Sequence, residues 1–163
     1  MNIKPLVANS ILAALYIAVS MAIAPFGFGS IQFRISEMFN HLVVFNKKFF
    51  PGIVLGVIIT NFFSPTAAYD LIFGVGQSVI SLLIAILTAR FVKNVLLRMF
   101  INTIVFTITM FLIALELHLA IGLPFLLTWL TTAAGEFAVM LAGIPVMLSL
   151  NMKVNFNKLI ERK

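Results

Sequence analysis

The sequence predicts an all-α integral membrane protein: one domain, residues 1–163, with six transmembrane helices and both termini in the cytoplasm. Three observations predict it. Hydrophobic residues make up 62% of the chain and charged residues 10%, against about 25% charged residues in ordinary soluble domains. The apolar stretches are long and do not alternate, which favours helices over a membrane barrel. The basic residues also collect at alternate polar breaks, as the positive-inside rule requires.

The charge pattern sets the expected orientation. With the N-terminus inside, Arg34 is the one basic residue that falls outside, and Glu161 is the one acidic residue that falls inside. A small membrane protein that collects carboxylates and an arginine in its outer half is expected to bind a polar ligand there. The basic residues placed inside are Lys4, Lys47, Lys48, Arg90, Lys93, Arg98, Lys153, Lys158, Arg162 and Lys163.

The composition and motifs argue against several classes of function. The net charge of +6 is explained by topology and anionic lipid headgroups, so we expect no nucleic-acid partner. The chain has no cysteine, no H-E-x-x-H and no nucleophile elbow, so we expect no metal, no cofactor and no enzymatic activity. No G-x-x-x-x-G-K-[ST] is present, so active transport must draw energy from an ion gradient or a partner.

The first helix is expected at residues 6–24, where Pro25 ends the apolar run. Ala22-Ile23-Ala24 has the form of a signal-peptide cleavage site, but the run is longer than the typical 7–15-residue signal core, and we interpret it as a retained helix. Ala14, Ala18 and Ala22 form a ridge of small residues on this helix. Such a ridge packs against another helix of the chain or docks a partner protein, and spacing alone favours neither.

The next two helices are short. They are expected at 37–45 and 50–63, the latter with Pro51 in its first turn. Thirteen helical residues rise roughly 20 Å, less than the membrane core of about 30 Å. These segments therefore lean on longer neighbours, and the loop 26–36 is expected to form the wall or lid of a cavity.

The last three helices are longer, and we expect them at 70–92, 95–117 and 123–150. Asn61, Asp70 and Gln77 lie on the outer halves of the third and fourth helices. Asp70 is interpreted as a helix cap, whereas Asn61 and Gln77 need polar partners inside the membrane. The remaining residues, 151–163, form a basic cytoplasmic tail.

A polar string leads into the second helix. Ser36 could cap that helix and Arg34 could pair with Glu37, which is a purely structural interpretation. Alternatively, Gln32, Arg34 and Glu37 point into a pocket. The residues alone leave these two readings equally balanced.

Glu136 lies well inside the last helix, where a charge costs roughly 2.5–3.5 kcal/mol and so needs a partner, a proton or a ligand. Trp129 shares a helix face with it, because seven residues make two turns. A tryptophan beside a carboxylate suits a flat ring that donates hydrogen bonds. The alternative is a tryptophan of the interfacial belt together with a structural Glu–Arg pair.

Ile31-Gln32-Phe33-Arg34-x-Ser36-Glu37, Leu55-Gly56-x-x-x-x-Asn61 and Gly135-Glu136 resemble the QueT family. These proteins are substrate-binding (S) components of energy-coupling factor (ECF) transporters, assigned to queuosine precursors. The resemblance spans nearly the whole chain and implies a bundle like that of ECF S components in the bacterial cell membrane. It further implies a transmembrane coupling subunit and two cytoplasmic ATPases as partners, and it assigns Ala14 and Ala18 to docking.

The ligand implied by this resemblance is a 7-deazaguanine, either queuine or its aminomethyl or cyano precursor. A carboxylate of Glu37 or Glu136 suits the two donors of a guanine-type edge, and the carbonyl oxygen needs a donor. We expect the site among Gln32, Phe33, Arg34, Glu37, Asn61, Asp70, Gln77, Trp129 and Glu136, with Phe33 or Trp129 stacking on the ring. The alternatives are an S component for another vitamin or nucleobase, a stand-alone secondary transporter, and an intramembrane enzyme using Glu37 and His41.

Overall fold

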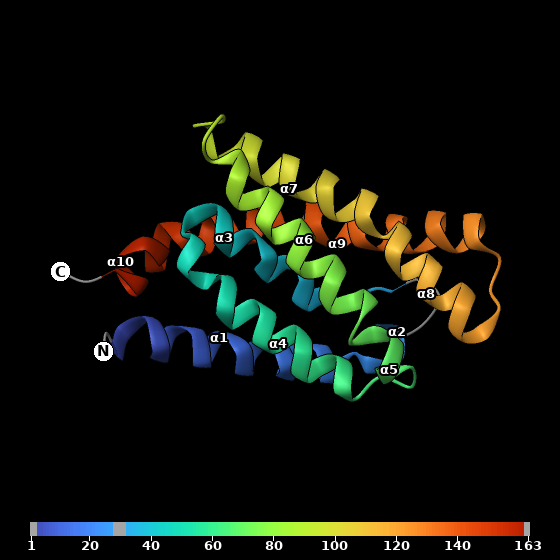
Figure 1. Ribbon diagram of the computed structural model, residues 1–163. Coiled ribbons are helices and arrows are strands. Elements are labelled where there is room, and N and C mark those ends of the chain that lie inside the picture. Colours follow the sequence, from blue (N-terminus) through green and yellow to red (C-terminus); the bar gives the residue numbers. More distant parts are fainter. Residues whose placement is uncertain (1–2, 28–31, 162–163) are drawn as a thin grey trace.

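The computed structural model describes residues 3–27 and 32–161, and every regular element in this part of the chain is a helix (Figure 1). Residues 28–31 of the predicted loop 26–36 and the basic residues Arg162 and Lys163 lie outside the described residues. The elements are α1 (Ile3–Ala22), α2 (Ala24–Gly27), η1 (Ile35–His41), α3 (Leu42–Phe45), η2 (Lys47–Phe49), α4 (Phe50–Phe62), α5 (Ala67–Asp70), α6 (Phe73–Thr88), α7 (Val95–Thr109), α8 (Phe111–Ile121), α9 (Phe125–Val154) and α10 (Phe156–Ile160).

The main helices pack in a closed ring. α1 packs on α4, α4 on α6, α6 on α7, and α7 on α9, and η1 then closes the ring between α9 and α1 (Figure 1). α8 continues α7 and contacts both α6 and α9. Side chains from segments far apart in the sequence therefore face one interior.

Four helical stretches among the described residues are long and apolar enough to cross a membrane: Ile3–Ala22, Ala67–Thr88, Val95–Ile121 and Phe125–Val154. Ile35–Phe45 is apolar but too short to do so, and α4 has 13 residues, so both predicted short segments are indeed short. The all-helical membrane fold is confirmed. Six spans, and the side of the membrane on which the termini lie, stay predictions.

The structure corrects several predicted boundaries. The second segment is a 3₁₀-helix followed by one α-turn, and it begins two residues earlier than expected. The fourth splits into α5 and α6 and ends at Thr88, and the fifth breaks at Met110, where α7 gives way to α8. The sixth continues through Pro145 to Val154.

Most of the predicted basic tail is helical as far as Ile160. The residues before Asn155 extend α9, and α10 then folds back with Phe156 and Ile160 buried. The Phe156 ring packs against those of Phe45 and Phe49, with centroids 5.5 and 6.1 Å apart. This packing joins the C-terminal helix to the turn between α3 and α4.

The two ends of the bundle differ in charge. The start of α1, the turn between α6 and α7, and α10 lie at one end, whereas α2, α5 and the turn after α8 lie at the other (Figure 1). Lys4, Arg90, Lys93 and Lys158 belong to the first end, and Arg34 precedes η1 in the half that holds α2 and α5.

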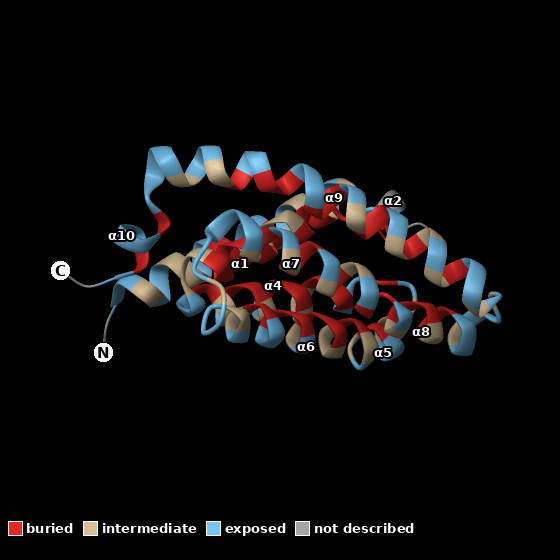
Figure 2. Cartoon of the chain, turned by 90° about the horizontal axis from the view of Figure 1, so that it is seen from above, coloured by how far each residue is buried: buried red, intermediate tan, exposed pale blue. Residues whose placement is uncertain are grey.

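Burial follows the inner faces of the helices (Figure 2). An apolar cluster that includes Tyr16, Phe49, Leu82, Phe106 and Met140 fills the interior. Large apolar side chains on the outer faces are exposed, as expected for helices surrounded by lipid. Polar side chains are buried as well, and those with charges gather in one part of the ring.

Candidate functional site

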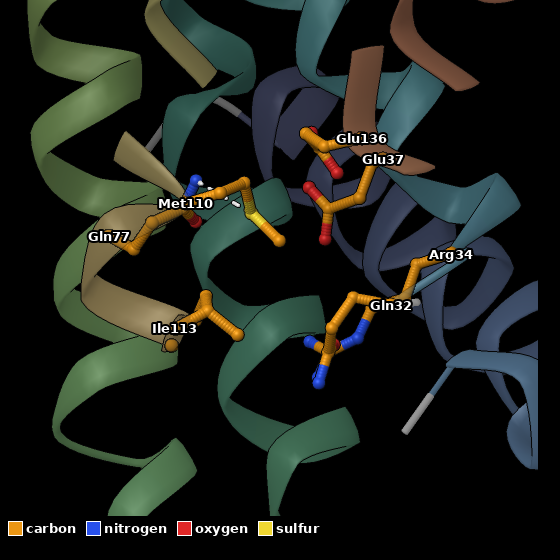
Figure 3. Close-up of a pocket in the computed structure, with 8 residues that line it drawn as sticks. Gln32, Arg34, Glu37, Gln77, Met110, Ile113 and Glu136 are labelled. Atoms are coloured by element: carbon orange, nitrogen blue, oxygen red, sulfur yellow. Dashed lines mark hydrogen bonds between the residues drawn. The ribbon is translucent and has the colours of Figure 1, made fainter. Parts of the chain in front are cut away.

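A cavity inside the ring of helices collects polar side chains from four separate segments. Gln32 and Arg34 precede η1, Glu37 lies on it, Gln77 lies on α6 and Glu136 lies on α9, and their side chains turn toward the same space (Figure 3). The full lining consists of Gln32, Arg34, Glu37, Gly74, Gln77, Met110, Ile113 and Glu136. Five of the nine residues predicted for binding therefore lie around one hollow.

The cavity is narrow in this structure. Only about 10 Å³ of it admits the centre of a water-sized sphere, which is room for about one water molecule. A bicyclic base can enter only if part of the wall moves. Met110 is an adaptable apolar part of the lining, because an unbranched thioether side chain repacks easily.

Glu37 is held in place by two donors. The hydroxyl of Tyr16 donates to Oε1 over 2.5 Å, and the amide of Asn40 donates to Oε2. Ser36 does not cap the helix, which was one of the two interpretations left open by the sequence. η1 begins at Ile35, and the Ser36 hydroxyl lies 2.6 Å from the Ser20 hydroxyl, with which it forms a hydrogen bond. Both bonds to the α1 side chains Tyr16 and Ser20 fix the start of η1 against α1.

Arg34 is buried and joins three parts of the chain. Its Nε donates to the Gly27 carbonyl at 2.8 Å, its Nη1 to Asn61 Oδ1 at 3.2 Å, and its Nη2 forms an ion pair with Asp70 Oδ1 at 3.3 Å. The charge partner is thus Asp70, where the sequence had suggested Glu37. The pairing neutralises one carboxylate, and the Arg34 side chain lines the cavity.

Asp70 supports Arg34 and does not cap the following helix. Its Oδ2 accepts hydrogen bonds of 2.6 Å from both Ser64 and Thr66, while α6 begins after Ile72 without a side-chain cap. Asn61 donates to the backbone carbonyl of Asp70 at 3.0 Å. Asn61 and Asp70 therefore lie behind Arg34 and orient it, rather than lining the cavity.

Two backbone positions near Arg34 are constrained: Gly74 by close packing and Gln32 by its conformation. Gly74 has no room for a side chain, because a Cβ there would lie 2.7 Å from the amide nitrogen of Asn61. Gln32 has a backbone φ of 52°, the left-handed region that costs a non-glycine residue free energy. Such strain is common at ligand sites, and here it belongs to a side chain that lines the cavity.

Glu136 is the least satisfied of the lining groups. It is 2% exposed, and no hydrogen bond of normal length reaches its Oε1 in the described part of the chain. Gln77 differs, because its amide donates to Thr109 Oγ1 at 3.0 Å and its carbonyl oxygen accepts from Ser78 at 3.2 Å. Glu136 is therefore the acceptor most open to a ligand.

The two predicted stacking rings lie elsewhere. Phe33 is 39% exposed, and the Trp129 ring packs against Phe111 and Phe125 with centroids 6.4 and 6.2 Å apart. Neither belongs to the lining of the cavity. The apolar walls are instead Met110 and Ile113, which sequence reasoning missed because apolar residues in an apolar helix carry no signal.

Sequence reasoning left a fourth buried carboxyl group, that of Glu116, out of the predicted site. Glu116 is fully buried on α8, and no hydrogen bond of normal length reaches either carboxyl oxygen among the described residues. Asp70 and Arg34 are close enough to act on it electrostatically. A glutamate inside an apolar run was a visible signal, because an ionisable residue in a membrane segment is a functional candidate by default.

His41 has a structural role. Its Nε2 lies 2.9 Å from the Met140 carbonyl oxygen, and its Nδ1 lies 3.3 Å from the amide nitrogen of Asn102. These contacts hold η1 against α9 and α7, so the histidine has no group free for acid–base work with Glu37. Among residues 3–27 and 32–161, no three His, Asp or Glu side chains are grouped to hold a metal ion.

Comparison with known proteins gives two matches. The family described as QueT transporter matches residues 6–152. The protein named queuosine precursor transporter QueT from Lactococcus lactis subsp. cremoris (strain MG1363) is 37% identical over 161 residues, covering 94% of this chain and 95% of that protein. No solved structure matches.

Proposed function

Because the chain belongs to the QueT transporter family, we propose that it is the substrate-binding component of an ATP-driven importer for a queuosine precursor. The family assignment makes the chain a transporter, not an enzyme, and a multi-pass protein of the bacterial cell membrane. The proposal adds the ligand, the pocket and the partners. The ligand is a 7-deazaguanine: queuine or its aminomethyl or cyano precursor.

The observation that carries the proposal is the convergence of five hydrogen-bonding side chains on one cavity (Figure 3). A guanine-type edge offers N1–H and an exocyclic NH₂, and the open carboxylate of Glu136 accepts both. The ring carbonyl takes a hydrogen bond from Gln77 or Arg34. Met110 and Ile113 supply apolar contact for the ring faces in place of the aromatic stacking that the sequence suggested.

The position of the cavity, at the end of the bundle opposite the basic residues, is evidence that the pocket faces outward. The cavity lies with Arg34 in the half that holds α2 and α5, away from the basic end that carries Lys4, Lys93 and Lys158. By the positive-inside rule, the basic end faces the cytoplasm. The ligand then enters from outside and is delivered inward without chemical change.

The alanine ridge supports a docking face. Ala14, Ala18 and Ala22 are all exposed, so they do not form the contact between α1 and its neighbours within the chain. That contact uses glycines of α4 instead: a Cβ at Gly52 would lie 2.5 Å from Asn9, and one at Gly56 would lie 2.8 Å from Tyr16. The exposed ridge suits close approach of a helix from a coupling subunit.

The energy for transport comes from partners in this proposal. The sequence has no nucleotide-binding loop, so ATP hydrolysis belongs to two cytoplasmic ATPases that act through the coupling subunit. The family and the exposed ridge are what favour this arrangement over a stand-alone transporter.

A binding assay on the purified protein tests the ligand. Guanine, queuine and its aminomethyl and cyano precursors are compared side by side with riboflavin and thiamine. We expect tight binding of at least one 7-deazaguanine; tight binding of a vitamin, with none of the deazaguanines, would reject the ligand. Uptake is then measured in cells with and without the coupling subunit and ATPases, and uptake without them would reject the partners.

A further inference from the structure

α1 presents two different faces to its surroundings. The outward face carries the exposed ridge of Ala14, Ala18 and Ala22, whereas the inward face buries Tyr16 and Ser20. Of the four candidate spans, α1 is the least embedded, with 22% of its apolar window buried against 33–39% for the others. A larger share of α1 than of the other three stretches is therefore open to lipid or a partner, while its inward face packs closely on α4.

Tyr16 is packed between Gly56 of α4 and Glu37, which lines the pocket. Its ring lies against Gly56, where a Cβ would be 2.8 Å from the tyrosine Cβ and 2.9 Å from Cγ. Its side chain is completely buried, and its hydroxyl reaches Glu37 Oε1 at 2.5 Å. A displacement of α1 relative to η1 therefore moves this hydroxyl away from the carboxylate.

The second polar bond from α1 goes to the same short helix. Ser20 bonds Ser36, the residue next to Glu37. The two bonds lie one turn apart on α1 and tie it to the segment that carries a pocket carboxylate. The other donor to Glu37 is Asn40, which lies on η1 itself and would move with it.

From this geometry we propose that Tyr16 is a positioning residue that links the outward face of α1 to the pocket. With α1 seated, its hydroxyl fixes the Glu37 carboxylate for the ligand; when a coupling subunit docks on the alanine ridge and shifts α1, that bond is lost and the ligand is held less tightly. The inference rests on the proposed function, because it needs both a pocket ligand and a partner on α1.

The variant Tyr16→Phe removes one oxygen atom and keeps the ring that packs on α4. Loss of a hydrogen bond to a charged group weakens an interaction by about 10-fold or more, and we expect that loss in ligand affinity for the free subunit. Tyr69→Phe is the matched control, because it also removes one tyrosine hydroxyl. Tyr69 is 40% exposed on α5 and does not line the cavity. Thermal unfolding of both variants confirms that each is folded.

The decisive experiment compares ligand affinity in the free subunit and in the subunit assembled with its coupling subunit, using the tightest binder of the four bases tested above. In the native protein, docking should weaken binding. In Tyr16→Phe the free subunit should already bind as weakly as the docked native protein, so docking should change its affinity by a factor near one. Tyr69→Phe should behave like the native protein in both states.

Other outcomes overturn the link. If Tyr16→Phe weakens binding by the same factor in both states, the tyrosine only shapes the pocket. If it changes neither state, or if docking leaves the native affinity unchanged, the link does not exist even though the binding function stands. If the native protein binds none of the four bases, the proposed function itself fails.

Discussion

Replacing Glu136 by glutamine tests the pocket at its most open acceptor. The substitution keeps the size of the side chain and exchanges a carboxylate for an amide. Two donors of the base then face one carbonyl oxygen and one NH₂ group, so one pair becomes a donor facing a donor. Hydrogen bonds to a charged group contribute about 1.5–3 kcal/mol, so affinity should fall by roughly 10-fold to 150-fold.

Although Glu136→Gln should lower ligand affinity, it should leave the stability of the folded protein unchanged or raise it. Glu136 is 2% exposed and its Oε1 has no hydrogen-bond donor in the described part of the chain, so its charge is expensive in the unliganded protein. We therefore expect Glu136→Gln to insert and to unfold at an equal or higher temperature. A large loss of affinity in a protein of unchanged stability marks a direct ligand contact.

Isothermal titration with purified protein measures the effect. Glu161→Gln is the control, because this carboxylate is exposed at the opposite end of the bundle. A base that lacks the exocyclic amine gives a second arm: it should bind the native protein weakly and lose little more in Glu136→Gln, since both changes remove the same contact. Unchanged affinity in Glu136→Gln, or equal losses in the control, would refute the assignment.

Three further sets of substitutions test other parts of the structure. Ala14→Leu with Ala18→Leu should leave binding of the isolated protein intact and abolish uptake by the assembled transporter; equal loss of both would mean that the ridge packs internally. Gly56→Ala should lower stability by about 1–3 kcal/mol in thermal or denaturant unfolding, because the added Cβ overlaps the aromatic ring of α1. Arg34→Met should cost about 3–5 kcal/mol by leaving Asp70 buried without its cation, and Arg34→Met with Asp70→Asn should recover part of it; no recovery would disprove the pair as the cause.

The fold class was predictable because a chain can span a membrane only as helices or as a closed barrel. Apolar runs of helical length and the segregation of basic residues were enough to place the helices, and most boundaries agree within a few residues. The breaks were harder to predict. α7 gives way to α8 at Met110 without proline or glycine, next to Thr109, whose hydroxyl donates to the carbonyls of Val105 and Phe106 in the preceding turn.

Part of the candidate site was also predictable from the sequence, whereas the contacts that depend on the tertiary structure were not. Glu37 and Glu136 were visible because a carboxylate in a membrane segment stands out against apolar neighbours. The partner of Arg34 was not visible, since Asp70 lies 36 residues away and only the ring of helices brings the two together. Trp129 shows the limit of helical periodicity: two turns place it on the face of Glu136, but its ring packs against Phe111 of α8 and does not line the cavity.

The same physics explains why the two carboxylates of the cavity differ. Glu37 lies on a 3₁₀-helix too short to cross the membrane. The neighbouring helix α1 supplies Tyr16 as one donor, and Asn40 of the same short helix is the second donor. Glu136 lies within a long helix whose own backbone amides are already bonded, and no donor from residues 3–27 or 32–161 reaches its Oε1. In a low-dielectric cavity, an acceptor without a donor raises the free energy of the empty protein. A ligand that donates two hydrogen bonds removes this cost on binding, so the open carboxylate favours occupancy by a base with a guanine-type edge over one that presents only acceptors.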